Sequence, residues 1–171
     1  MQAQDILDFW FEELTDKQHF VKDPALDVMM RKRFGTTLEA AARCELFTWR
    51  TTPQGRLAEI LVLDQFSRNI FRDTPRAFAH DTLALVLAQE LVGSTLDRSL
   101  TERQRVFVYM PYMHSESPAI HEQAIQLFSQ PGLAGNLDFA LRHKAIIDRF
   151  GRYPHRNQVL ERASSALEVA F

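Results

Sequence analysis

Arginine, aspartate and histidine side chains gather at two places in the sequence, around Arg68 and around Arg152, and their types suit anion binding or proton transfer. A guanidinium group is a planar fork of donors that matches carboxylates and phosphates. Histidine changes its charge near neutral pH, and a carboxylate can act as its partner or as an acid itself. The candidate ligand-binding residues are Asp64, Arg68, Asn69, Arg72, His114, Glu116, Arg149, Arg152, His155, Arg156 and Asn157.

The two places share a short motif, Asp-x-Phe-x-Arg, at residues 64–68 and again at 148–152. Each copy is followed by a proline and then an arginine, Arg76 and Arg156, at the predicted start of the next helix. A cation at a helix N-terminus opposes the helix dipole, whereas an anion is favoured there. The pattern therefore predicts a negative group nearby, either a bound phosphate or carboxylate or an aspartate of the protein itself.

These residues support two interpretations. Asp–Arg pairs can tie helix ends together without forming a binding site, because structural ion-pair networks resemble functional clusters. Alternatively, the same side chains line an anion-binding pocket. The charge distribution is compatible with both: the first 30 residues carry seven acids and two lysines, and residues 142–162 carry six bases and two acids. The sequence leaves the choice open.

Proline and capping signals define the elements that position these side chains. An N-cap residue precedes proline in Asp23-Pro24, Thr52-Pro53, Thr74-Pro75 and Ser117-Pro118, and residues 101–104 form a capping box. Apolar periodicity predicts about eight helices, at 6–14, 26–38, 57–71, 77–92, 106–113, 120–128, 137–150 and 159–169. Segment 57–71 is apolar almost all round and should be the most buried. No strand-like alternation occurs, so we expect one all-α domain over residues 1–171, with the helices in antiparallel pairs.

Composition excludes several classes of protein. The 171 residues carry a formal charge of −2 and a pI near 6.3, so no basic field is present to hold nucleic acid. One cysteine excludes an internal disulfide. No apolar run approaches the roughly 20 residues that span a bilayer, and no signal peptide is recognisable. We expect a cytoplasmic protein without nucleic-acid or membrane partners, and the oligomeric state stays open.

The sequence contains no established catalytic or metal-binding motif. His114, Glu116, His121 and His143 lack the spacing of a metal site, so we predict no metal and no cofactor. No phosphate-binding glycine loop or nucleophile elbow is present. Asp64, His114 and His155 remain candidates for acid–base catalysis. An enzyme of undefined reaction is therefore the alternative to a binding module.

Three long motifs resemble a known family. Residues 63–79, 109–116 and 149–157 are similar to the signatures of a bacterial domain of unknown function, family 924, and the opening Leu7-Asp8-Phe9-Trp10-Phe11 also fits. The resemblance covers essentially the whole chain. It implies a right-handed, tetratricopeptide-like array of antiparallel helices, and it brings no reaction or catalytic residues. We therefore predict a binding module with an arginine-rich polar groove for a peptide or small anionic ligand, the alternative being a small-molecule enzyme that uses the same residues.

Overall fold

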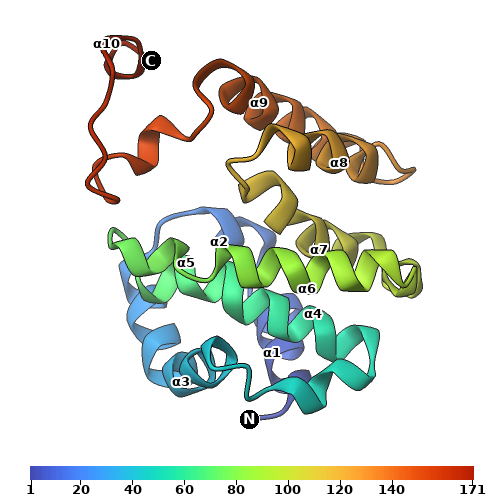
Figure 1. Cartoon of the computed structure of the whole chain (residues 1–171). Coiled ribbons are helices and arrows are strands. Elements are labelled where there is room, and N and C mark those ends of the chain that lie inside the picture. Colours follow the sequence, from blue (N-terminus) through green and yellow to red (C-terminus); the bar gives the residue numbers. More distant parts are fainter.

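The computed structural model describes all residues, 1–171, and the chain folds into helices without any strand (Figure 1). The α-helices are α1 (Ala3–Asp8), α2 (Asp16–Phe20), α3 (Pro24–Ala42), α4 (Pro53–Leu61), α5 (Ser67–Ile70), α6 (Asp81–Gly93), α7 (Glu102–His114), α8 (Pro118–Phe128), α9 (Ala134–Phe150) and α10 (Ala166–Val169). The π-helical turns are Phe9–Glu13 and Val62–Phe66, and the 3-10 turns are Phe47–Thr51, Pro75–Phe78, Leu96–Ser99 and Pro154–Arg156. The predicted all-α class is confirmed.

Most predicted helix starts are confirmed. Asp23 accepts hydrogen bonds from the first backbone N–H groups of α3, Thr52 caps α4, and Thr101 forms the predicted capping box with Gln104 at α7. Pro75 is an exception, because it begins only a 3-10 turn and α6 starts later, at Asp81. None of the helices combines the length and apolar character needed to cross a bilayer.

The predicted last helix, 159–169, is wrong over most of its length. Only Ala166–Val169 is helical. Glu161 has a left-handed backbone, with φ of 54°, which ends regular structure there. The Arg162 side chain binds the Glu116 carboxylate at 2.7 and 2.9 Å and the Tyr153 carbonyl at 3.1 Å. These long-range polar contacts hold the backbone in a turn that the apolar pattern does not reveal.

The most buried segment runs from α4 through the π-helical turn Val62–Phe66 into α5. Every residue from Leu57 to Leu63 is fully buried, as predicted. This segment packs against α1, α3, α6 and α7, and the aromatic rings of Phe9, Phe34 and Phe66 meet in the same core. Asp64 lies in the middle of this segment and is itself buried.

The tetratricopeptide-like arrangement is not confirmed. In a solenoid each repeat contacts only its neighbours. Here α1 packs against α4, and α4 packs against α6 and α7. The helix pair α8–α9 lies above the block formed by α1 to α6, with α7 between them (Figure 1). The chain after α9 turns back beside this pair and ends just after α10.

Candidate functional site

Asp64 owes its position to the π-helical turn Val62–Phe66. A π turn widens the helix by one residue, and such turns are frequent at functional sites. Asp64 and the next residue, Gln65, are both buried, at 1% and 6% exposure. The Gln65 amide donates to Asp64 Oδ2 at 2.7 Å. A carboxylate at this depth needs compensation from charged or hydrogen-bonding partners.

His114 and Arg68 supply that compensation. His114, the last residue of α7, lies with Nδ1 2.8 Å from Asp64 Oδ1, and Arg68 Nη1 lies 3.2 Å from the same oxygen. Burial by itself raises the pKa of Asp64. The positive charge of Arg68 and the contacts with His114 and Gln65 outweigh burial, so the pKa of Asp64 is lowered. Asp64 is therefore a carboxylate, and His114 donates its Nδ1–H to it.

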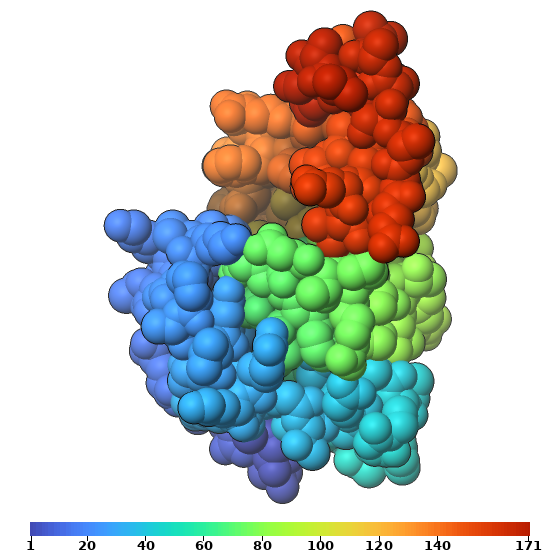
Figure 2. All heavy atoms as spheres, turned by 90° about the vertical axis from the view of Figure 1, so that its left-hand side faces the viewer, coloured from blue at the N-terminus to red at the C-terminus, as the bar shows by residue number.

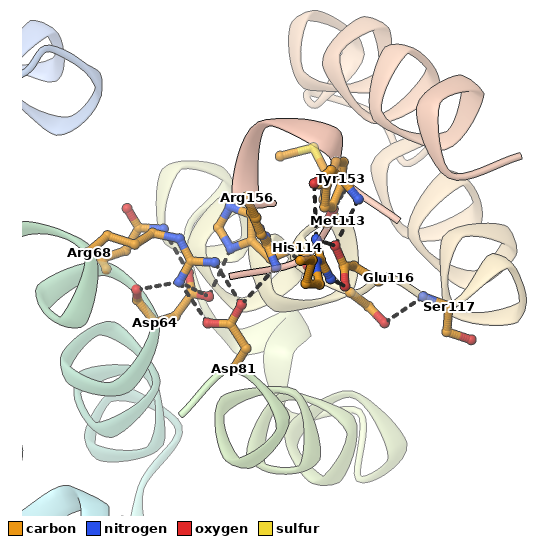
Figure 3. A network of polar contacts seen from close by, with 12 residues as sticks. Asp64, Arg68, Asp81, Met113, His114, Glu116, Ser117, Tyr153 and Arg156 are labelled. Atoms are coloured by element: carbon orange, nitrogen blue, oxygen red, sulfur yellow. Dashed lines mark hydrogen bonds and ion pairs between the residues drawn. The ribbon is translucent and has the colours of Figure 1, made fainter. Parts of the chain in front are cut away.

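Asp81 joins the two arginine-rich places of the sequence (Figure 3). Arg68 Nη1 and Nη2 donate to the two carboxylate oxygens of Asp81, each at 2.9 Å. Arg156 Nη1 lies 3.4 Å from Asp81 Oδ2, and Arg156 Nη2 donates to the His114 carbonyl at 3.0 Å. Both guanidinium groups also lie over the Phe78 ring. The predicted convergence of Arg68 and Arg156 is therefore present as an ion-pair network.

Charges in this network balance. Two carboxylates, Asp64 and Asp81, face two guanidinium groups, Arg68 and Arg156. Burial lowers the pKa of His114, Arg68 lowers it further, and Asp64 acts in the opposite direction with a smaller effect. The imidazole is thus neutral at pH 7, with its proton on Nδ1. Its Nε2 has no hydrogen-bond partner in the protein and is not sealed from solvent.

The main cavity, of about 470 Å³, lies between the N-terminal segment and α9, with α5 and α7 behind it. Figure 2 shows the blue N-terminal segment and the orange α9 on either side of a recess on this face. The cavity is lined by His19, Phe20, Val21, Gln65, Arg68, Asn69, Arg72, Met110, Met113, His114, Asn136, Phe139 and His143. A second cavity of about 320 Å³ lies beyond the network and is also bordered by His114, together with Asp81 and Arg156.

Arg72 and Asn69 line the main cavity and are held by Asp27 of α3. Arg72 Nε and Nη2 donate to the Asp27 carboxylate at 2.5 and 2.9 Å, and the Asn69 amide donates to it at 2.9 Å. Arg72 Nη1 has no partner in the protein. It is a free arginine nitrogen of this cavity, as is Nε of Arg68, whereas both Nη atoms of Arg68 donate to Asp64 or Asp81.

The remaining candidates lie in the C-terminal segment, except Glu116, which lies between α7 and α8 and contacts that segment. Glu116 binds Arg162, Arg152 binds Glu168 at 2.6 and 2.8 Å, and Asn157 donates to Ser164. These contacts fasten residues 153–168. Arg149 and His155 are exposed and border neither of these cavities.

Sequence reasoning missed Asp27 and Asp81, the partners of the arginines. The sequence predicted a helix start at residue 77, which placed Asp81 within the helix. In the structure Asp81 is the first residue of α6. It also missed the cavity residues Phe139 and His143. Their spacing of four on a predicted helix places them on one face, which is a usable signal.

The comparisons with known proteins agree with the fold and leave the chemistry open. A model for a bacterial protein of unknown function, DUF924, matches residues 6–171. The chain belongs to this family. The solved structure of ATU0120, a protein of unknown function from Agrobacterium tumefaciens, is similar to this DUF924 chain, with a TM-score of 0.93 and 39% sequence identity over 98% of this chain and 94% of that one. None of the curated proteins matches. The function of this DUF924 protein must therefore be argued from its own cavity.

Proposed function

We propose that this protein binds a small organic acid in the main cavity. The observation that carries the proposal is the composition of that cavity: polar groups from α5 and α7 at its inner wall and apolar side chains toward the N-terminal segment and α9. Its volume, about 470 Å³, lies within the range of small-molecule sites, roughly 300–1,000 Å³. Of the two ligand classes expected from the sequence, a small anion therefore suits the cavity better than a peptide.

The carboxylate of the ligand would bind at Arg72. Its Nη1 is free, while Asp27 holds the rest of the guanidinium group in place. A charge-assisted bond from a fixed arginine gives orientation as well as affinity. Because Asp27 balances the charge of Arg72, we expect modest affinity and a weaker salt dependence than a bare cationic pocket would show.

The apolar body of the ligand would lie against Met110 and Met113, which are buried, and beneath Phe20, Val21 and Phe139. These last three are 65%, 47% and 55% exposed. Exposed large apolar side chains at the rim of a cavity indicate a surface that a ligand covers. The apolar body would thus supply much of the binding free energy.

We also propose that the protein is cytoplasmic. Cys44 is a free, exposed thiol, the state that a reducing compartment maintains. The alternative function, a small-molecule enzyme, is favoured by one observation, the Asp64–His114 pair at the cavity wall.

Calorimetric titration with butyrate, hexanoate and octanoate, with hexanamide as the neutral counterpart, tests the proposal. We expect affinity to rise with chain length and to be at least fivefold higher for hexanoate than for hexanamide. Arg72→Gln should remove the preference for the acid, whereas Arg149→Gln, which changes an exposed arginine outside the cavity, should keep it. The absence of binding by all four compounds, or equal losses in both variants, would refute the proposal.

A further inference from the structure

His114 has the geometry of a base held by a carboxylate. Its Nδ1–H donates to the buried carboxylate of Asp64 at 2.8 Å, which fixes both the tautomer and the ring. In general acid–base sites a carboxylate in this position orients the imidazole and stabilises the cation that forms on proton transfer. Nε2 then carries the lone pair, and the residue borders both the main cavity and the second cavity.

The surroundings of His114 keep that lone pair available. The charged groups around the imidazole are Asp64 and Arg68 from the buried helix and Asp81 from α6. Arg156 from the 3-10 turn pairs with Asp81 and donates to the backbone carbonyl of His114. Together the charges of these groups balance, so no excess negative charge holds a proton on Nε2. Nε2 has no partner within the protein, whereas Nδ1 of His121, also unpartnered, is sealed.

The nucleophile follows from the lining of the cavity. No serine, threonine or cysteine borders the main cavity. A histidine base there can activate only water or an acidic group of the ligand. Arg72 Nη1 is a free donor in the same cavity, and it suits a carbonyl oxygen that becomes negative during the reaction.

We propose that His114 is the general base of an ester hydrolysis in the main cavity, with Asp64 as its positioning residue. The proposal rests on the small-molecule site proposed above and names its substrate class, an ester of an apolar carboxylic acid, of which the organic acid is the product.

In the reaction, Nε2 of His114 takes a proton from water as the water oxygen bonds to the acyl carbon. Arg72 donates to the resulting oxyanion. The bond from the acyl carbon to the alcohol oxygen then breaks, and the proton on Nε2 passes to that oxygen. Ester and water become acid and alcohol, and nothing is oxidised or reduced.

The test uses p-nitrophenyl acetate, butyrate and hexanoate as substrates. We expect kcat/KM to rise with acyl length and His114→Asn to lower it at least tenfold, since the asparagine amide can still donate to Asp64. His155→Asn, which removes an exposed histidine outside the cavity, should keep the wild-type value. A wild-type rate in His114→Asn, or equal losses in both variants, would refute the role of His114.

Asp64→Asn separates positioning from a merely structural role. We expect kcat to fall with KM nearly unchanged, and the midpoint of the pH–rate profile to move to lower pH, because the carboxylate that favours protonated His114 is gone. An unmoved midpoint would refute the positioning role. Thermal unfolding confirms that each variant folds.

Hexanoate binding distinguishes the two proposals. If His114→Asn binds hexanoate like the wild type but its kcat/KM is at least tenfold lower, the base assignment stands. If the wild type binds hexanoate but His114→Asn hydrolyses normally, only the catalytic proposal fails. If the wild type does not bind hexanoate, the site itself is refuted.

Discussion

Residues 64–68 and 148–152 carry the same Asp-x-Phe-x-Arg motif in opposite surroundings. In the first copy the aspartate is 1% exposed and the arginine returns to it across one helical turn, at 3.2 Å. In the second copy Asp148 is exposed and pairs with Lys144 at 2.6 Å, while Arg152 reaches Glu168 instead. The first copy forms part of the wall of a cavity, and the arginine of the second copy forms an ion pair with the C-terminal segment.

The residue before each arginine explains the difference. Ser67 continues the helix, with φ of −55° and ψ of −43°, so Arg68 faces Asp64 at the i,i+4 spacing. Gly151 adopts φ of 69° and ends α9, which directs Arg152 away from Asp148. A shared motif therefore does not imply a shared role, because backbone conformation and burial decide what the arginine contacts.

Removing the aspartate of each copy should give the largest difference in the free energy of unfolding between the two copies. Asp64→Ala leaves the Nδ1–H of His114 without its acceptor and Arg68 with one carboxylate fewer in a buried setting, so we expect a loss of about 3 kcal/mol in the free energy of unfolding. Asp148→Ala breaks an exposed pair and should cost a small fraction of that. Urea unfolding of both variants measures the contrast, and equal losses would contradict it.

The next largest effect should be on the pH dependence of stability, which distinguishes the buried network around the first copy from the exposed second copy. The folded-state pKa of His114 lies below its value in the unfolded chain, near 6.5. The unfolded state therefore binds the proton more tightly, and stability is lost as pH falls below about 6.5. His19, His121 and His155 share this direction. His114→Asn should remove its part of the decline, at most about 1.4 kcal/mol per pH unit, whereas Arg149→Gln should keep the wild-type slope. Urea unfolding from pH 7.5 to 5 provides the measurement, and an unchanged slope in His114→Asn would contradict the assignment.

Features of the fold that depend on local interactions could be predicted from the sequence. Helix starts marked by a cap and a proline, such as Asp23-Pro24, were predictable because the capping interaction is local. The burial of 57–71 followed from its apolar composition. The turn at Arg162 was not predictable, since it depends on Glu116, 46 residues away.

The candidate site was predictable in its residue types and only partly in its contacts. Asp64, Arg68, His114 and Arg156 do come together, but Asp81 had no local signal as the carboxylate that joins both arginines. Whether these residues form an ion-pair network or a binding site could be decided only from the contacts of each side chain in the structure. The network uses both Nη atoms of Arg68, while Arg72 keeps one nitrogen for the cavity.

Gly151→Ala tests whether the glycine redirects the second arginine. No atom lies within 4 Å of a Cβ added there, so the change acts through the left-handed backbone alone and should cost about 1 kcal/mol. We also expect faster hydrogen exchange in residues 163–169, because strain at Gly151 loosens the contact between Arg152 and Glu168. A variant with wild-type stability and exchange would show that the glycine is dispensable for this arrangement.

Ser67→Ala, at the matching position of the first copy, should have the smallest effect and the opposite sign. Ser67 is fully buried, and its hydroxyl has no hydrogen-bond partner. Alanine keeps the helix and removes an unsatisfied polar atom, so we expect stability to be unchanged or to rise by up to about 1 kcal/mol. Urea unfolding of Ser67→Ala and Gly151→Ala measures the sign of the stability change in each variant. If Ser67→Ala is instead destabilising by more than Gly151→Ala, the hydroxyl has a partner in solution, such as a buried water, and the wall beneath Arg68 is more polar than the contacts between its side chains indicate.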